Sequence, residues 1–190
     1  VMGILALAGL AGAYYLNRPH ERLFATGVSG HERVTLADGT FIEINTDTAV
    51  RIANKAATRT VYLDRGEAFF QVKHDAAHPF VVIAGNHRIT DIGTAFDVRS
   101  EQKVLAVAVI EGRARFDAPQ NPAFRPLDLK PGDRVVATAK GISRSTAPLS
   151  KLSDQLSWRR GMLVFYGTTL ADAAAQFNRY SDTKLVIADP

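Results

Sequence analysis

Short runs of β-branched and aromatic residues, separated by polar turns, fill the middle of the chain from residue 34 to residue 137. Runs of this length, with alternating apolar and polar positions, are typical of β-strands that bury one face. A succession of such runs favours an all-β domain. We predict strands over eight segments: 34–36, 41–44, 59–63, 68–72, 80–83, 95–98, 104–110 and 134–137.

Glycines between these runs predict tight turns. Asp38-Gly39 separates the first two runs, and this dipeptide predicts a hairpin because its turn requires a positive φ. Gly39, Gly66 and Gly93 are each 27 residues apart, which hints at stacked β-layers. We expect turns at four glycines beyond the hairpin: Gly66, Gly93, Gly112 and Gly132. The predicted fold is mainly β, a β-roll or sandwich-like domain over residues 34–138.

The first 16 residues carry no charge and end in Tyr14, Tyr15 and Leu16. The paired tyrosines suit a lipid–water interface, so we expect a transmembrane helix over residues 1–16. A span needs about 20 apolar residues, so we expect it to be truncated at its N-terminal end. Two alternatives stay open: the apolar part of a signal peptide cleaved near Ala11-Gly12-Ala13, and a buried helix. Residues 17–33 would be a juxtamembrane linker.

The C-terminal fifth of the chain changes pattern. Residues 140–153 are rich in Ser, Thr and Lys without periodicity, which indicates a linker over residues 139–157. Beyond it, Leu163-Val164-Phe165 is strand-like, a threonine at 168 or 169 can cap a helix, and residues 184–187 are again strand-like. We therefore predict a small β-α-β unit over residues 158–190.

Composition narrows the function classes. The chain has 46% hydrophobic residues, a net charge of +4 and no cysteine. The absence of cysteine excludes disulfides, thiolate nucleophiles and cysteine-based metal sites. Basic residues are scattered, and Arg159-Arg160 is the one adjacent pair, so a nucleic-acid groove is not indicated.

Five segments of the β-rich region resemble successive motifs of the FecR domain, in the order found in that family. They are 34–40 (VTLADGT), 63–72 (LDRGEAFFQV), 78–82 (HPFVV), 93–98 (GTAFDV) and 109–113 (VIEGR). In that family a cytoplasmic helical domain binds an extracytoplasmic-function sigma factor, and one helix crosses the inner membrane. The periplasmic part receives a signal, usually from a TonB-dependent outer-membrane transporter of iron carriers.

The resemblance implies a sigma-factor regulator, or anti-sigma factor, that acts by binding and not as an enzyme. Residues 1–16 would lie in the lipid of the bacterial inner membrane, and residues after about 17 would lie in the periplasm. The sigma-binding domain would precede Val1. No cofactor and no metal are implied.

Residues 158–165 (WRRGMLVF) are similar to the start of the small secretin and TonB short N-terminal domain that follows the FecR domain in these regulators. The resemblance assigns transporter contact to this unit, whose unpaired strand edges would suit a partner strand. Alternatively, Leu163, Phe165 and Phe177 form its small core. The predicted partner-binding residues are Leu163, Val164, Phe165, Leu185, Val186 and Ile187.

Gly93-Thr94 is a hypothetical self-cleavage pair, because some members of the family cut themselves at a Gly-Thr pair in this motif. The threonine hydroxyl would attack the preceding carbonyl, and water would open the resulting ester. The alternative is a turn glycine followed by a strand threonine.

Other candidate chemistry is weaker. His74 and His78 could share a metal on a helix, but Pro79 disfavours that helix, and a polar turn is the expected structure. Glu67 and Glu111 could form the carboxylate pair of a hydrolase, although no accompanying motif supports it. A periplasmic module that binds envelope polymer stays open as the alternative function.

Overall fold

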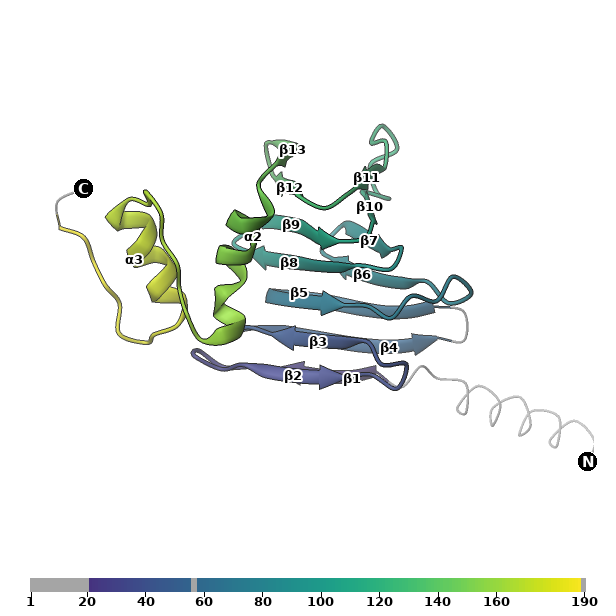
Figure 1. The fold of residues 1–190 in the computed structure, drawn as a ribbon, viewed down its shortest axis with the longest axis horizontal. Coiled ribbons are helices and arrows are strands. Elements are labelled where there is room, and N and C mark those ends of the chain that lie inside the picture. Colours follow the sequence, from purple (N-terminus) through teal and green to yellow (C-terminus); the bar gives the residue numbers. More distant parts are fainter. Residues whose placement is uncertain (1–20, 56–57, 189–190) are drawn as a thin grey trace, which may run out of the picture.

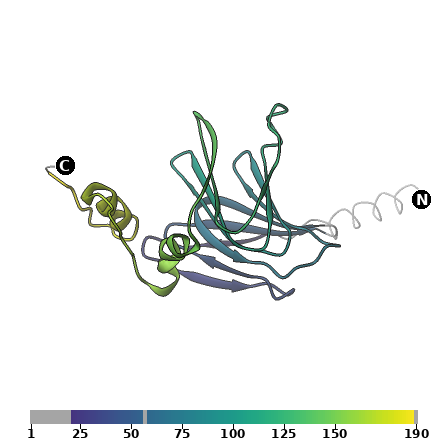
Figure 2. The same cartoon turned by 45° about the horizontal axis from the view of Figure 1, so that its top comes forward.

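The computed structural model describes residues 21–55 and 58–188, and its thirteen strands join in one curled sheet (Figure 1, Figure 2). The predicted mainly β fold is therefore confirmed. The strands are β1 (Glu21–Ala25), β2 (Glu32–Thr35), β3 (Phe41–Ile44), β4 (Ala49–Lys55), β5 (Thr58–Gln71), β6 (Phe80–Ala84), β7 (His87–Asp91), β8 (Ala95–Glu101), β9 (Val104–Glu111), β10 (Ala114–Asp117), β11 (Leu127–Leu129), β12 (Asp133–Thr138) and β13 (Gly141–Thr146). The helices are α2 (Leu149–Gln155), the 3-10 helix η1 (Leu156–Arg160) and α3 (Leu170–Arg179).

The long strand β5 belongs to two half-sheets. Its first half pairs with β4 and, in parallel, with β6, and the first half-sheet runs β1-β4-β5-β6-β7-β10-β11. Its second half pairs with β3 and β8, and the second half-sheet runs β2-β3-β5-β8-β9-β12-β13. The sheet curls because one strand continues through both.

Gly66 lies where β5 passes from one half-sheet to the other. Its φ is +89°, and a Cβ atom there would lie 2.1 Å from Thr48 Oγ1. The pairing with β4 also shifts by one residue between Ala49 and Val50, opposite this point. The prediction of a turn at Gly66 is therefore wrong: the glycine bends a continuous strand, and the runs 59–63 and 68–72 are both parts of β5.

One hydrophobic core fills the space between the two half-sheets. Alternate residues of β5 enter it, as the period of two predicts, and Phe70 stacks on Phe96 with ring centroids 5.1 Å apart. Phe80 from the first half-sheet packs on the Phe70 ring. Leu, Ile, Val and Phe from both half-sheets are thus removed from water together.

All eight predicted runs lie in strands, two of them in β5, and the predicted Asp38-Gly39 hairpin joins β2 to β3. The sheet extends further on both sides than residues 34–138. β1 lies in the predicted juxtamembrane linker, and β13, α2 and part of η1 lie in the predicted linker over residues 139–157. β13 was missed because it is an exposed edge strand of polar residues, which carries no apolar alternation.

The predicted β-α-β unit is correct in its helix and wrong in its strands. Thr169 caps α3 by accepting a hydrogen bond from the Asp172 backbone N–H at 3.1 Å. Residues 163–165 and 184–187, on either side of α3, have no regular secondary structure, and neither segment forms a ladder. A strand-like composition does not make a strand when no neighbouring backbone supplies hydrogen bonds.

The predicted transmembrane segment over residues 1–16 lies outside the described residues. Within residues 21–55 and 58–188, no helix is long and apolar enough to cross a membrane.

Candidate functional site

The outer face of the second half-sheet, which points away from the core, carries three carboxylates that are nevertheless buried. Ala68 and Phe70 of β5 enter the core, so Glu67 and Phe69 point to the opposite face. Glu43 of β3 and Asp97 of β8 flank Phe69 in register. The C-terminal part of the chain covers this face and buries all three carboxylates.

Glu43 is fully buried and is matched by basic groups. Arg159 of η1 donates to Glu43 Oε1 at 2.6 Å, and Arg33 of β2 donates to the same oxygen at 3.0 Å. His31 Nε2 lies 3.6 Å from Oε2. Burial raises the pKa of Glu43, but the two arginines outweigh burial and hold that pKa below its usual value.

Arg159 is fixed by packing as well as by charge. Its guanidinium lies 3.7 Å from the centre of the Phe69 ring, a cation–π distance. The neighbouring Trp158 is buried in a small cluster with Phe69, Ala95 and Leu156. η1 is therefore anchored to the sheet by an ion pair and an apolar contact together.

The end of α3 makes a second anchor. Arg179 donates to Glu67 Oε2 at 2.5 Å and lies 2.6 Å from Glu101 Oε1. Burial lowers the pKa of Arg179, but the two carboxylates raise it above its ordinary value, so the arginine stays charged. Asn45 Nδ2 donates to both Glu67 Oε2 and Tyr180 Oη.

Backbone contacts complete this second anchor. Thr46 Oγ1 donates to the Arg179 carbonyl at 3.0 Å, and Ser29 Oγ donates to the Tyr180 carbonyl. These carbonyls belong to the C-terminal end of α3, where helical acceptors lack partners of their own. We call the two anchors, Arg159 on Glu43 and Arg179 on Glu67, the clasp.

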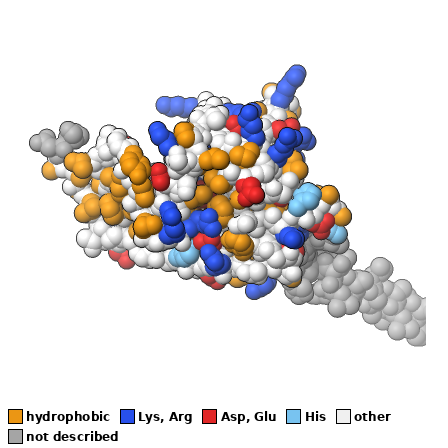
Figure 3. Space-filling view, in the orientation of Figure 1, with side chains coloured by type: hydrophobic (Ala, Val, Ile, Leu, Met, Phe, Trp, Pro, Cys, Tyr) orange, Lys and Arg blue, Asp and Glu red, His pale blue; other side chains and the backbone are white. Residues whose placement is uncertain are grey.

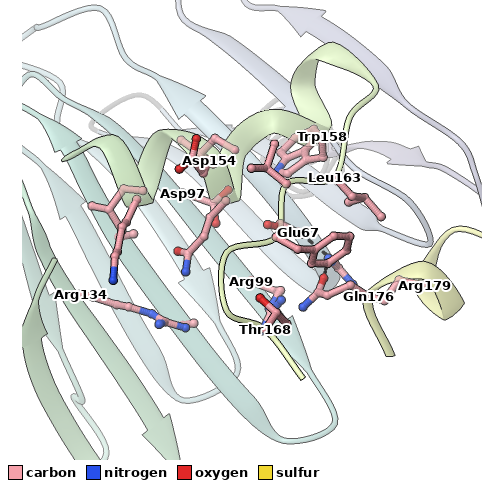
Figure 4. Close-up of a pocket in the computed structure, with 18 of the residues that line it drawn as sticks. Glu67, Asp97, Arg99, Arg134, Asp154, Trp158, Leu163, Thr168, Gln176 and Arg179 are labelled. Atoms are coloured by element: carbon pink, nitrogen blue, oxygen red, sulfur yellow. Dashed lines mark hydrogen bonds and ion pairs between the residues drawn. The ribbon is translucent and has the colours of Figure 1, made fainter. Parts of the chain in front are cut away.

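A cavity of about 330 Å³ lies between this sheet face and the C-terminal segment (Figure 4). Charged side chains line it from β8, β12 and α2, and apolar ones line it from η1 and residues 163–165. Asp97 is at its base, where burial and the nearby Glu67 raise the pKa of Asp97 well above its usual value. We call this space the clasp cavity.

The predicted partner-binding residues have two different environments. Leu163, Val164 and Phe165 are half-buried and line the clasp cavity, and the Phe165 ring lies 5.5 Å from that of Phe177. Leu185 and Val186 are exposed, the latter by 84%, and Ile187 is half-buried. Partner contact through these residues stays a prediction.

Hydrophobic side chains gather on the surface of α3 and the segments around it (Figure 3). The exposed members of this apolar surface are Met162, Tyr166, Leu170, Phe177, Leu185 and Val186. Large apolar side chains clustered on a surface often mark a site of protein contact.

Gly93-Thr94 lies in the turn between β7 and β8. Gly93 has φ +90°, and its N–H donates to Asp91 Oδ2 at 2.8 Å. Thr94 is buried, and its hydroxyl donates to the Arg113 carbonyl at 2.6 Å. Burial raises the pKa of Asp91. A hydroxyl, a glycine with positive φ and a carboxyl thus lie within four residues of one another.

The remaining sequence candidates separate in space. His78 pairs with Asp75 at 2.9 Å in the predicted polar turn, whereas His74 packs against Gly93. Glu67 pairs with Arg99 of β8, and Glu111 pairs with Ala95 of the same strand. Because Ala95 and Arg99 are four residues apart, the two glutamates are separated by about 13 Å along the strand direction. That separation exceeds the spacing of a glycosidase carboxylate pair.

Sequence reasoning missed Glu43, Arg159 and Arg179 as site residues. Arg159 belongs to the one adjacent basic pair, which was a usable signal. Glu43 stands in a predicted strand among apolar residues, and its partner follows 116 residues later, so no local pattern joins them.

The family model described as FecR protein matches residues 22–115, which hold strands β1 to β9 and most of the residues that anchor the clasp. No curated protein matches the chain.

Two crystal structures of a candidate anti-sigma factor from Parabacteroides distasonis are similar to this chain. One has a TM-score of 0.72 and 26% identity, and the match covers 85% of this chain and 75% of that one. The other has a TM-score of 0.71 and 26% identity, with 84% and 74% covered. With the five sequence motifs and the curled sheet, these matches show that the chain contains a FecR domain at residues 22–115.

Proposed function

We propose that this chain is the signal-receiving part of a sigma-factor regulator. The FecR domain and the likeness to a candidate anti-sigma factor support regulation of a sigma factor as the role. The protein binds an extracytoplasmic-function sigma factor through a domain outside this sequence. It crosses the bacterial inner membrane once, and residues after about 17 lie in the periplasm.

The apolar surface of the C-terminal unit is the observation that carries the proposal. Leu185 and Val186 are exposed beside α3, while the same unit is anchored to the FecR domain through Arg179. A partner that binds this surface therefore acts directly on an element in contact with the sheet. The partner is the signalling domain of a TonB-dependent outer-membrane transporter, and the signal concerns uptake of an iron carrier.

Signalling proceeds through the clasp. Partner binding at α3 competes with the contacts of Arg179 and exposes the outer face of the second half-sheet. The opened FecR domain becomes a better protease substrate, and cleavage releases the cytoplasmic part to act on its sigma factor. The local stability of a docked helix is lower than that of a sheet core, so it is the element most easily moved.

Site-specific crosslinking in native envelopes tests this function. A photoreactive residue replaces Val186 in the full-length protein, and a matched control replaces Gln120, which is exposed on a loop between β10 and β11. Under inducing conditions we expect a TonB-dependent transporter to crosslink to the residue at position 186 and not to the one at position 120. A sigma factor should co-purify with both photoreactive variants. Attachment of envelope polymer alone would instead favour the polymer-binding module.

Self-cleavage at Gly93-Thr94 is a second activity that the local geometry favours. Thr94 Oγ attacks the Gly93 carbonyl carbon, the C–N bond breaks, and the hydroxyl proton passes through Asp91 to the freed amine. Water then hydrolyses the ester, leaving a Gly93 carboxylate and Thr94 as a new N-terminus. The hydrogen bond from the Gly93 N–H to Asp91, which places a carboxyl beside the scissile peptide, and the positive φ of Gly93 support this route.

Intact-mass measurement after periplasmic expression tests the cleavage. We expect a fragment that begins at Thr94 from the wild type and from Thr94→Ser, which keeps a hydroxyl, and none from Thr94→Ala. A wild-type protein that stays whole, or a Thr94→Ala variant that is still cut there, would refute it.

A further inference from the structure

Two arginines on the outer face of the second half-sheet are without a counter-ion among the described residues. Arg99 of β8 and Arg134 of β12 both line the clasp cavity, and neither makes a hydrogen bond or an ion pair with a carboxylate there (Figure 4). Strand β9 runs between them and presents Ala106 and Ala108 to the cavity. The two small side chains leave open space between the guanidinium groups.

The two guanidinium groups repel one another. Burial lowers the pKa of Arg134, the charge of Arg99 lowers it further, and Asp97 offsets only part of this effect. Lys151 of α2 adds a third basic group to the lining. Like charges gathered in a partly buried space are unfavourable unless an anion joins them.

A buried donor on the opposite wall is an independent sign of a missing partner. Trp158 is 6% exposed, lines the same cavity, and its Nε1–H has no hydrogen-bond acceptor among the described residues. Asp97 is 9% exposed and its Oδ1 also has no partner. Buried polar groups are nearly always hydrogen-bonded, so an indole N–H and a carboxyl oxygen left open in one cavity point to a ligand.

The remaining acidic groups leave the cavity positive. Glu67 is already paired with Arg179, and the raised pKa of Asp97 favours its uncharged form. Asp154 on α2 and Asp172 on α3 are the other acidic residues of the lining, and the three basic groups Arg99, Arg134 and Lys151 outnumber them. Leu156, Leu163 and Phe165 give the space an apolar side.

We propose that the clasp cavity binds a small oxyanion, a carboxylate or phosphate carried on a short apolar body, between Arg99 and Arg134. A planar guanidinium pairs with either group through two parallel hydrogen bonds. A volume of about 330 Å³ suits a small metabolite and not a peptide segment. Because sheet and C-terminal segment both line the cavity, the ligand strengthens the closed clasp. This site is independent of the transporter and sigma-factor proposal.

Trp158 provides the measurement, since it is the single tryptophan of the chain and lines the cavity. Tryptophan emission is recorded while succinate, glutarate or inorganic phosphate is added at constant ionic strength, with chloride as the reference anion. We expect a saturable change with at least one of the three, together with a rise in melting temperature. Succinate and glutarate against phosphate distinguish a carboxylate from a phosphate site.

Substitution of the two arginines tests whether the change in Trp158 emission comes from binding in the clasp cavity. Arg99→Gln and Arg134→Gln should each weaken binding at least tenfold, and the matched control Arg125→Gln, on an exposed loop, should leave it unchanged. Ala108→Leu, which fills the floor without removing charge, should also weaken binding. No response beyond that of chloride, or an equal response in the arginine variants, overturns the proposal.

Discussion

At the scale of single residues, the clasp depends on carboxylates that the sheet alone could not keep buried. Glu43 and Glu67 each have an arginine from the C-terminal part of the chain as partner. Removing one partner of a buried ion pair leaves an uncompensated charge, which costs more than the pair itself contributes. These residues therefore couple the stability of the FecR domain to the position of the C-terminal unit.

Arg159→Gln should lower the free energy of unfolding by about 2 kcal/mol, because the buried Glu43 loses its closest basic partner. The loss is limited because Arg33 still donates to Glu43. Urea denaturation checks this value. The neighbouring variant Arg160→Gln is the matched control, since Arg160 donates to Ser157 and not to Glu43. Equal losses in both variants would contradict a specific role for the Glu43 pair.

Asp97→Asn should stabilise the protein at pH 7, on the order of 1 kcal/mol. The folded pKa of Asp97 is raised above 3.8 by burial and by Glu67, so its contribution is fully present below the unfolded pKa. This stability is lost as pH rises through the folded pKa, because the buried carboxyl then becomes charged. Asparagine stays neutral at every pH and so avoids the loss. Urea midpoints at pH 7 and near pH 4 measure the effect, and the advantage of asparagine should shrink at the lower pH.

Asp128→Asn is the control with the opposite sign. Arg115 lowers the pKa of Asp128, so this exposed pair stabilises above the unfolded pKa and is lost as pH falls. Its substitution should therefore slightly destabilise at pH 7. A shift in the same direction as Asp97→Asn would contradict the assignment of a buried, proton-favouring Asp97.

At the scale of secondary-structure elements, the strands were predictable and their continuity was not. The β-branched and aromatic run 68–72 predicted a strand that is part of β5, and Asp38-Gly39 predicted its hairpin. Gly66 gave the same local signal as Gly39, although it bends a strand, because the difference comes from Thr48 on the neighbouring chain segment. Tertiary contacts of this kind leave no mark on local sequence.

The candidate site was less predictable than the fold. Leu163–Phe165 was predicted as a strand from composition, and its environment depends on a cavity formed by distant strands. The clasp pairs are more than 100 residues apart in sequence, so a charge pattern could not reveal them. The family resemblance predicted contact by the C-terminal unit, whereas the ion pairs that dock it depend on the folded arrangement of distant residues.

Gly66→Ala should destabilise by at least about 3 kcal/mol, because the new Cβ meets Thr48 and the residue must keep a positive φ. Gly39→Ala is the matched control. Gly39 has φ +86° with open space around it, so its substitution should cost about 1 kcal/mol. Thermal or urea unfolding checks both, and equal costs would mean that the close approach to Thr48 is unimportant.

Arg179→Gln should loosen α3 without loosening the sheet. The end of α3 loses its contacts with Glu67 and Glu101, while the core between the half-sheets is untouched. Hydrogen exchange should rise by at least tenfold over residues 170–180 and stay unchanged in β5 and β8. Arg125→Gln should alter neither, and increased exchange across the whole sheet would contradict a local clasp.

At the scale of the whole molecule, one strand makes two half-sheets into one cooperative unit. β5 supplies both with hydrogen bonds, and a single core lies between them. Neither half-sheet can lose its structure without exposing the apolar face of the other. Cooperative unfolding of this kind is usual for single domains of this size.

Urea unfolding followed by far-UV circular dichroism should therefore show one transition for the sheet. The fluorescence of Trp158, which reports on the outer face, should change at the same urea concentration or a lower one. Gly66→Ala should move the sheet transition as a whole. Two separate transitions in circular dichroism would contradict the shared-strand architecture.

The placement of β1 and α3 has a mechanical consequence. The described chain enters the sheet at the start of β1 and leaves through α3, at opposite ends of the strands (Figure 1). A pulling force between these two points runs along the strands, so the hydrogen bonds that cross them share the load in shear. The clasp crosses the same line of force with far fewer bonds. If the proposed anchor and partner pull on these two points, the clasp yields first, and the sheet keeps its fold while its outer face opens.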